Sequence, residues 1–414
     1  MTQKLPYLKM TLLSMAGLFL ALAAQAQWTE KIGVARRGAA QSFVLDGKIY
    51  VSGGYVGFTD GYEANTKAYD PVANDWENAK SPSTANRSGG VGFSINGKGY
   101  IGLGQKNFLS FSPSPEDLLD MNEYDAKTNS WTEKAAFPGK GRVGATVFVL
   151  NNVAYIVGGS LTENDKSTNQ VWAYDPEADT WTQKADLPVK TAYASAFAQG
   201  TLGYVTGGLG DAGTSIKATY SYDPEMDTWT AAANLPKATV GGTAFSIGKY
   251  SYYCLGSDKD LGETGAKFPK AVYRYDAETD AWTTSSLTWQ NDGRLWPVSG
   301  VIDGKAYLGT GYKFDGGEFP YGDFFELDIT LTSITSEQLK TITAFPNPAN
   351  NQLHIQGLDS EGVLSVYSVE GKNLLQTTYN ENTTIDISAL PVGLYTLSIE
   401  TGTKKYTTSL CIAR

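Results

Sequence analysis

The chain has 414 residues, of which 41% are hydrophobic and 18% charged, with 45 glycines, 25 tyrosines and one histidine. Few charges, many turn-forming residues and many aromatic residues indicate an all-β protein of two or three domains. A single histidine argues against metal centres and hydrolase triads that need imidazoles, and the net charge of −10 argues against binding nucleic acid. We therefore expect no metal and no cofactor.

Residues 1–26 have the features of a secretory signal peptide. Lys4 and Lys9 precede an apolar stretch over 10–24, and Ala24-Gln25-Ala26 provides small residues around a cleavage site. We expect the mature chain to begin at Gln27. No later stretch approaches 18 consecutive apolar residues, so no transmembrane segment is expected in the mature chain.

A unit of about 50 residues repeats along residues 27–331. Tryptophan recurs at positions 28, 76, 131, 181, 229 and 282, and in the last five cases a Tyr-Asp pair begins seven residues earlier. An apolar strand that ends in a diglycine-like turn lies upstream of each pair. Each unit thus has four short strands, which in the third unit we place at Val143–Leu150, Val153–Val157, Val171–Tyr174 and Thr180–Lys184. Such units bury their faces by stacking radially into a β-propeller.

The number of blades follows from how the chain closes. The sixth unit has its turn at Gly309-Thr310-Gly311, but no tryptophan follows it, whereas residues 27–31 closely copy residues 130–134. The mature N-terminus is therefore predicted to supply the last outer strand, which gives six blades. The repeated phrases resemble the Kelch repeat. This resemblance implies a six-bladed Kelch propeller but no single function, because the family contains enzymes, adaptors and cell-surface binders.

After a linker at 332–340, residues 341–414 are predicted to form a small β-sandwich. Its expected strands are Leu353–Gln356, Leu364–Ser368, Thr384–Ile387, Leu394–Ile399 and Lys405–Ile412. A Pro-Asn-Pro start at 346–348 and the segment Leu390-Pro391 with Gly393 and Tyr395 resemble the type A C-terminal sorting domain of type IX secretion. The resemblance implies that residues 341–414 address the chain to this machinery, for export to the surface or exterior of a bacterium. The alternative is an ordinary carbohydrate-binding sandwich.

Candidate ligand-binding residues come from a fixed spacing. The residue 16 positions before each diglycine is Arg37, Arg87, Arg142, Thr191, Thr239 and Arg294 in the six units. We expect these residues to start the innermost strands, so that the four arginines meet at one mouth of the central channel. Two positions later, Tyr193 and Trp296 interrupt a series of small residues, and Tyr55, Phe58, Phe108 and Tyr312 follow the diglycine turns on the same face. In the alternative interpretation, the arginines pair with carboxylates or carbonyls of a neighbouring blade.

The predicted function is a secreted or surface-attached binding module. Its ligand is expected to be anionic or polar, either an acidic sugar or a peptide segment of a protein, because guanidinium groups orient carboxylates well. A second hypothesis is an enzyme similar to sialic-acid mutarotases, in which an arginine acts with a carboxylate from Asp60, Glu63, Asp211 or Glu318. A third is a structural or adhesive surface protein. Asp258, Asp260 and Glu263 lack a full calcium ligand set.

Overall fold

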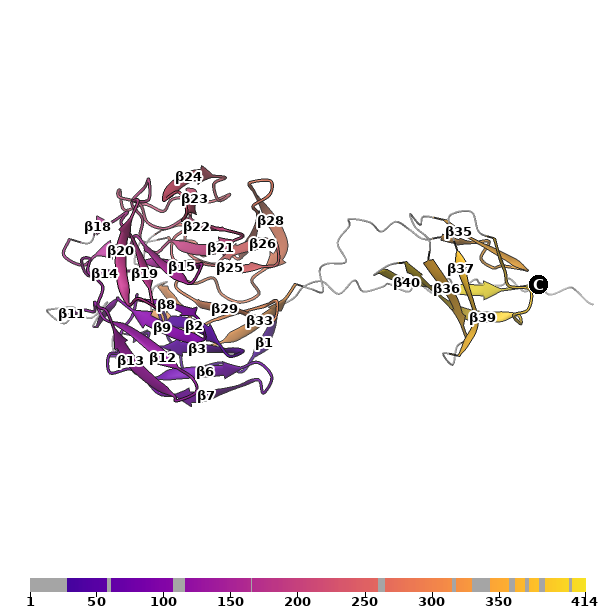
Figure 1. Ribbon diagram of the computed structural model, residues 1–414, viewed down its shortest axis with the longest axis horizontal. Coiled ribbons are helices and arrows are strands. Elements are labelled where there is room, and N and C mark those ends of the chain that lie inside the picture. The colour runs from indigo at the N-terminus through magenta and orange to yellow at the C-terminus, as the bar shows by residue number, and fades with distance from the viewer. Residues whose placement is uncertain are drawn as a thin grey trace, which may run out of the picture. The chain divides into compact units, whose positions relative to one another are not determined.

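The computed structural model divides the chain into two compact units, Met1–Thr332 and Ser333–Arg414 (Figure 1). It describes residues 28–57, 61–106, 116–164, 166–259, 265–314, 318–329, 343–356, 362–368, 372–379, 384–401 and 404–414. The predicted signal peptide and linker lie outside these residues. No helix long and apolar enough to cross a membrane occurs in the described ranges.

The first unit is a β-propeller with six four-stranded antiparallel blades in its described part. The inner strands are β2 (Gln41–Leu45), β8 (Val91–Ile95), β15 (Thr146–Leu150), β21 (Ser195–Gln199), β25 (Thr243–Ile247) and β29 (Val298–Ile302). Each inner strand contacts the next, and β29 contacts β2, so the six strands close into a ring. The predicted fold class is therefore confirmed.

The remaining strands complete the blades from the axis outward. Blade 1 continues with β3 (Lys48–Ser52), β6 (Thr66–Asp70) and β7 (Asp75–Ala79). Blade 2 continues with β9 (Lys98–Gly102), β12 (Met121–Asp125) and β13 (Ser130–Lys134). Blade 3 continues with β16 (Val153–Val157), β19 (Val171–Asp175) and β20 (Thr180–Lys184). Blade 4 continues with β22 (Leu202–Thr206), β23 (Thr219–Asp223) and β24 (Thr228–Ala232). Blade 5 continues with β26 (Tyr250–Cys254), β27 (Ala271–Asp276) and β28 (Ala281–Thr288). Blade 6 continues with β30 (Lys305–Gly309), β33 (Phe324–Asp328) and β1 (Trp28–Lys31).

The third blade begins later than predicted. Residues 143–145 do not belong to its inner strand, because the chain turns at Gly144 with a φ of 63°. Arg142 and Val143 instead form β14 (Arg142–Val143), which pairs with β17 (Ser160–Leu161). Pairs of short strands follow the diglycine-like turns of blades 1, 2, 3 and 6: β4 (Tyr55–Gly57) with β5 (Gly61–Tyr62), β10 (Gln105–Lys106) with β11 (Glu116–Asp117), β17 with β18 (Lys166–Ser167), and β31 (Tyr312–Phe314) with β32 (Glu318–Pro320).

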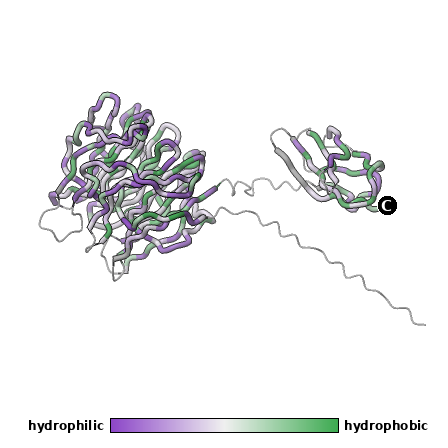
Figure 2. Tube along the Cα trace, turned by 90° about the horizontal axis from the view of Figure 1, so that it is seen from below, coloured by the Kyte–Doolittle hydropathy of each residue, from purple (hydrophilic) through white to green (hydrophobic). Residues whose placement is uncertain are grey.

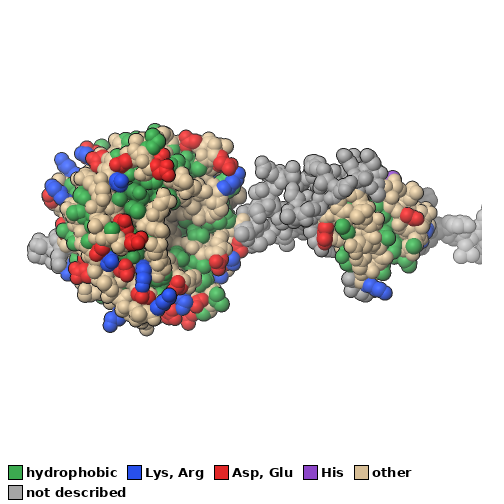
Figure 3. Space-filling model, viewed as in Figure 1, with side chains coloured by type: hydrophobic (Ala, Val, Ile, Leu, Met, Phe, Trp, Pro, Cys, Tyr) green, Lys and Arg blue, Asp and Glu red, His purple; other side chains and the backbone are tan. Residues whose placement is uncertain are grey.

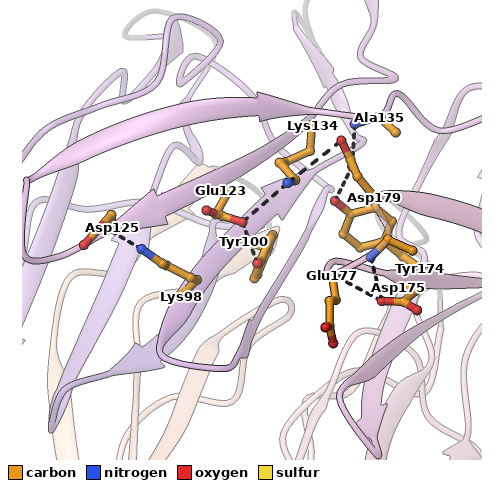
Figure 4. A network of polar contacts seen from close by, with 11 residues as sticks. Lys98, Tyr100, Glu123, Asp125, Lys134, Ala135, Tyr174, Asp175, Glu177 and Asp179 are labelled. Atoms are coloured by element: carbon orange, nitrogen blue, oxygen red, sulfur yellow. Dashed lines mark hydrogen bonds and ion pairs between the residues drawn. The ribbon is translucent and has the colours of Figure 1, made fainter.

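A repeated clamp joins neighbouring blades at their outer strands. Between blades 2 and 3, the Asp179 carboxylate accepts hydrogen bonds from the Tyr174 hydroxyl at 2.8 Å and from the Ala135 N–H at 2.9 Å (Figure 4). Trp181 Nε1 also donates to the Ala135 carbonyl at 2.9 Å. The equivalent acceptors in blades 1, 2, 4 and 5 are Asn74, Asn129, Asp227 and Asp280. All five have positive φ, a conformation that Asn and Asp tolerate better than most residues. Inside the blades, hydrophobic stretches form the core, and many peripheral turns are hydrophilic (Figure 2).

The N-terminal strand closes the sixth blade. β1 pairs with β33 in the antiparallel register that places Trp28 opposite Leu327, which confirms the predicted closure. Trp28 packs edge-on against Trp289, with ring centroids 4.9 Å apart, instead of making the clamp of the other blades. The nearly buried Glu326 carboxylate contacts Lys31 and Lys305, each at 3.1 Å, and accepts a hydrogen bond from Tyr307 at 2.8 Å. Lys31 therefore ties the first strand to the last one.

The second unit contains two sheets around one hydrophobic core. The strands are β34 (Thr343–Phe345), β35 (Gln352–Gln356) and β38 (Thr384–Asp386) in one sheet, and β37 (Asn373–Tyr379), β36 (Gly362–Tyr367), β39 (Gly393–Thr401) and β40 (Lys404–Ile412) in the other. Leu353, Leu364, Leu397 and Leu410 are among the fully buried side chains between them. Strands β34 and β37 were not predicted, because the first has three residues and the second lacks a clear alternation of apolar and polar residues.

Closure of blade 6 is predicted to depend on the charge of Glu326. Burial raises the pKa of this carboxyl, but hydrogen bonds from Tyr307, Lys305 and Lys31 outweigh it, so the pKa lies below the usual value near 4.5. Such a group stabilises the fold above its unfolded pKa, and the effect is lost as pH falls through the folded pKa. We expect Glu326→Gln to lower the free energy of unfolding by about 1 kcal/mol at pH 7.

Urea unfolding at pH 7 and at pH 3.5 measures this effect. The difference between wild type and Glu326→Gln should be smaller at pH 3.5, because the stabilisation from a carboxyl with a lowered pKa decreases once the pH is below the unfolded pKa. Glu77→Gln is the control, because Glu77 makes a similar ion pair with Lys48 on an exposed outer strand. A pH-independent difference for Glu326→Gln would contradict the electrostatic explanation.

Candidate functional site

A closed ring of backbone hydrogen bonds surrounds the propeller axis. Its members, one from each blade, are Ala39, Gly89, Gly144, Tyr193, Gly241 and Trp296. Each N–H donates to the carbonyl of the preceding member at 2.7–3.3 Å, and the Ala39 N–H completes the circle by donating to the Trp296 carbonyl. All six residues have φ between 51° and 67°. The left-handed conformation turns each chain into its inner strand and suits glycine best.

An open pocket lies on this ring. Its lining consists of the six ring residues and the residue that follows each of them, namely Ala40, Gly90, Ala145, Ala194, Gly242 and Pro297. Every blade thus contributes one pair, and no lining residue carries a charge. On the visible face of the propeller, charged side chains of both signs are scattered, without a large patch of one sign (Figure 3).

Tyr193 and Trp296 provide the two large side chains of the pocket. Their ring centroids lie 5.5 Å apart and their planes are inclined by 38°. A Cβ added to Gly144 would collide with the Tyr193 ring, and one added to Gly241 would collide with the Trp296 indole, so each aromatic ring covers the glycine of the preceding blade. Both side chains are half-buried. The prediction that these two residues lie at the channel is consistent with the geometry.

Short hairpins surround the pocket. Residues next to the ring pair with the first residue of a hairpin or loop, as in the bridges Gly38–Tyr55, Ala192–Leu209 and Leu295–Tyr312. Neighbouring hairpins also contact one another: Ser167 Oγ donates to the Leu209 carbonyl at 2.9 Å, and Ser215 Oγ to the Asp258 carbonyl at 2.7 Å. The pocket therefore lies at the base of a wall that is built by the loops after the diglycines.

The four arginines are buried inside the blades, which corrects the prediction that they line the channel mouth. Arg37, Arg87, Arg142 and Arg294 are each 0% exposed. In every case Nε donates to a carbonyl two or three residues earlier, and a terminal nitrogen donates to the carbonyl 16 residues later, at the first position of the diglycine-like turn. The 16-residue spacing therefore reflects a hydrogen bond within one blade.

Each guanidinium also reaches a polar side chain that directly precedes the third strand of its own blade. These partners are Asn65, Asp120, Gln170 and Asp323 for the four arginines in chain order. The alternative interpretation, internal pairing of the arginines, agrees with these contacts, although the partner belongs to the same blade. Burial lowers the pKa of Arg142 to about 10, so the group remains charged at neutral pH. These partners were not predicted from the sequence. The pattern that could have revealed them is a polar residue directly before the third strand of each blade that contains one of the four arginines.

The other predicted site residues are mostly buried as well. The Thr191 hydroxyl donates to the Gly207 carbonyl at 3.1 Å, the same 16-residue contact that the arginines make, and Thr239 lies beside the buried Tyr253. Tyr55 and Tyr312 are 2% and 1% exposed, and they pack together with ring centroids 5.4 Å apart. Trp296 stacks on Tyr312 at 6.4 Å. These two tyrosines support the pocket from behind and do not line it, which differs from the prediction. Phe58 and Phe108 lie outside the described residues.

The candidate acids do not meet at the pocket in the described part of the chain. The Glu63 carboxylate accepts a hydrogen bond from Asn65 and lies 3.9 Å from the Arg37 guanidinium. Asp211 pairs with Lys190 at 3.2 Å in an exposed position. Asp60 and the side chain of Glu318 lie outside the described residues, as do Asp260 and Glu263 of the considered calcium set. No cluster of three or more His, Cys, Asp or Glu residues that could hold a metal occurs in the described ranges.

Comparisons with known proteins agree with this architecture. A family model for the Kelch motif matches residues 36–83 and 141–188, and a model for a secretion system C-terminal sorting domain matches residues 343–413. The solved structure of YjhT superimposes with a TM-score of 0.59 over 71% of this chain and 96% of its own, at 16% identity, which shows the fold alone.

The chain is a Kelch-repeat β-propeller protein with a C-terminal secretion sorting domain. The sorting domain implies export through type IX secretion to the cell surface or the extracellular space.

Two curated relatives match parts of the Kelch propeller. Kelch-like protein 25 of Xenopus tropicalis is 28% identical over 39% of this chain and 27% of its own length. The N-acetylneuraminate epimerase of Vibrio cholerae is 33% identical over 26% of this chain and 28% of its own length. The chain thus spans little more than a quarter of each of these relatives.

The buried arginines are predicted to act on stability. Arg37→Ala would leave buried carbonyl and amide acceptors without their donor, so we expect the free energy of unfolding to fall by roughly 3 kcal/mol. The control is Arg36→Ala, which removes the neighbouring, exposed arginine and should change stability by less than about 0.5 kcal/mol. Chemical unfolding of the two variants makes the comparison. Equal effects would contradict the structural role of Arg37.

Proposed function

We propose that the Kelch propeller is a secreted binding module whose ligand occupies the axial pocket, against Tyr193 and Trp296. The observation that carries the proposal is the presence of two large aromatic residues at ring positions that favour glycine. At these positions, four other blades have Ala39, Gly89, Gly144 and Gly241.

Backbone strain makes this placement informative. Bulky residues with positive φ are uncommon, and holding such a residue there costs of order 1 kcal/mol or more. Tyr193 has a φ of 54° and Trp296 a φ of 51°. Because glycine satisfies the same fold in three other blades, folding does not require the two aromatic rings. Departures from local preference of this kind are expected at functional sites.

The pocket supports a polar ligand better than an anionic one. The arginines that suggested an anionic ligand donate to acceptors within their own blades and are not exposed. Aromatic rings, by contrast, contact the apolar face of a sugar or of a peptide side chain equally well. A sugar and a peptide segment thus remain the two ligand classes for this pocket, and the binding role of Arg37, Arg87, Arg142 and Arg294 is not retained.

The proposed route places this pocket outside the cell. Residues 1–26 would direct the chain to the Sec pathway as a signal peptide, and residues 341–414 would engage the type IX secretion machinery of a bacterium. The propeller would then act at the outer-membrane surface or in the surrounding medium. Matching of the sorting-domain model to residues 343–413 supports the second step.

A second candidate function is sugar epimerisation, which the similarity to N-acetylneuraminate epimerase favours. Acid–base chemistry of this type needs a carboxylate next to a group that stabilises charge. Among the described acids, three form ion pairs with the buried arginines. Asp120 and Asp323 are close partners of Arg87 and Arg294, whereas Glu63 lies 3.9 Å from Arg37. Glu63 is therefore the acid that this function would use, and the buried Arg37 would act on the charge of Glu63 without touching the substrate.

Tyr193→Gly separates function from folding. Glycine relieves the strained φ, so we expect the free energy of unfolding to stay within about 1 kcal/mol of wild type, whereas ligand binding should be lost. Binding is measured on an array of neutral and acidic glycans and on a peptide library, with the full-length protein. The control is Tyr220→Gly, a partly buried position on a blade strand, which should lower stability but leave pocket binding in the remaining folded protein. Array signals that persist in Tyr193→Gly would refute the pocket.

The second candidate makes a different prediction. If the propeller epimerises N-acetylneuraminate, the exchange rate between its anomers, measured by NMR, should rise with wild-type protein. Glu63→Gln should reduce this acceleration about 100-fold, because a general acid–base group contributes 10²–10⁴-fold. Glu77→Gln, on an outer strand, should retain it. An exchange rate that equals the buffer rate with wild-type protein would remove this candidate.

A further inference from the structure

The ring of backbone hydrogen bonds fixes which polar groups the pocket can offer. All six ring N–H groups donate to the neighbouring blade, so none of these six is available to a ligand. Each ring carbonyl accepts one of these bonds, and a carbonyl oxygen has a second lone pair; at Ala39 the second one accepts from Gln41 Nε2 at 3.1 Å. The backbone of the ring therefore presents hydrogen-bond acceptors and no N–H donors, and the side-chain donors of the lining are the Trp296 indole N–H and the Tyr193 hydroxyl. A ligand that matches the ring carbonyls carries donors, as a sugar hydroxyl does, whereas an anion would meet no charged donor among these lining residues.

The charge of the surroundings leads to the same conclusion. None of the twelve lining residues is ionisable except through the tyrosine hydroxyl of Tyr193. The nearby guanidinium groups are buried and bonded to carbonyls, amides or carboxylates of their own blades. A carboxylate that left water for this pocket would lose hydration without gaining a counter-charge from the described residues, which is unfavourable.

The aromatic pair restricts the shape of the ligand. A flat ring that is inserted between two aromatic planes must lie about 3.5 Å from each of them. The Tyr193 and Trp296 ring centroids are 5.5 Å apart, which is too close for such an insertion. The ligand must therefore lie across both rings and use one apolar face. The opposite side of the pocket has Ala39 and Gly89, which leave room for the body of that ligand. A pyranose has this combination of an apolar C–H face and a rim of hydroxyl donors.

We infer that the axial pocket selects an uncharged pyranose, such as the terminal sugar of a neutral glycan, over acidic sugars. The inference rests on the proposed function of the pocket and specifies its ligand class. Trp296 is the main stacking surface, because its ring is held from behind by the buried Tyr312. The selectivity follows from the absence of a counter-charge among the described lining residues and from the use of all six ring N–H groups within the ring.

A matched pair of probes tests this inference. Methyl β-D-glucopyranoside and methyl β-D-glucuronide have the same ring and differ at C6, where the second carries a carboxylate. Methyl β-D-galactopyranoside, N-acetylglucosamine, N-acetylneuraminate and choline complete the panel. Dissociation constants are measured by calorimetry and by saturation-transfer NMR with the full-length protein. We expect at least one neutral pyranoside to bind, and every acidic sugar to bind at least tenfold more weakly than its neutral counterpart.

Variants assign the binding to the pocket. Trp296→Ala should weaken the neutral sugar at least tenfold, whereas Trp296→Phe, which keeps an aromatic face, should stay within about fivefold of wild type. The control is Trp229→Phe, at an inter-blade position on the outer strand of blade 4, which should leave the dissociation constant unchanged. Thermal unfolding of each variant confirms that it is folded before binding is compared.

The outcomes separate this inference from the function on which it rests. Binding of an acidic sugar or of choline that is tighter than binding of the neutral pyranosides, and that is lost in Trp296→Ala, would overturn the ligand class but support the pocket. Binding of peptides alone, dependent on Tyr193, would do the same. If neither the arrays nor this panel gives binding that depends on Tyr193 or Trp296, the pocket itself is refuted, and the inference falls with it.

Discussion

The geometry of the propeller depends on six backbone hydrogen bonds that run in a circle around its axis. Each bond links one blade to the next at the point where the chain enters the inner strand, so every blade is held by two neighbours and the circle has no free end. To enter the circle, a residue must adopt positive φ, which normally excludes large side chains. The ring thereby controls where side chains can stand at the axis. Tyr193 and Trp296 are the two large residues at ring positions where the positive φ favours small ones.

The four buried arginines of this propeller make hydrogen bonds within their own blades. A guanidinium has several donors in one plane, so a single arginine can satisfy a carbonyl of its own entry segment, the carbonyl of the diglycine turn and a side chain at the third strand. Arg142 makes all three kinds of contact. In blade 4 the shorter Thr191 keeps only the contact with the turn. The burial of four cations is tolerated because each guanidinium donates to acceptors within its own blade, and these buried side chains are not exposed at the channel mouth.

Sequence reasoning predicted the fold well because repetition records backbone geometry. The spacing of tryptophans and Tyr-Asp pairs gave the blade number, and the copy of residues 130–134 at the N-terminus gave the closure by β1. The same reasoning identified the arginine position but assigned it to the wrong environment. A 16-residue spacing shows that two positions are coupled, yet it does not show whether the side chain between them points into a blade or into solvent. The Asn65 and Gln170 partners that decide this question are separated from their arginines by the turn and hairpin. Tyr193 and Trp296 were recognisable because they break a series of small residues.

The pocket and the closure of the ring are physically the same feature. All six blades contribute two lining residues each, so the pocket does not exist in a partly assembled propeller. Trp296 takes part in both: its indole forms one wall, and its carbonyl accepts the 3.3 Å bond from Ala39 that joins the last blade to the first. That junction also depends on β1, which comes from the N-terminal end of the propeller and is joined to β33 of blade 6 by hydrogen bonds and side-chain contacts alone. A ligand that contacts residues of several blades therefore binds the closed ring and not the opened one. By mass action, such a ligand stabilises the closure that created its site.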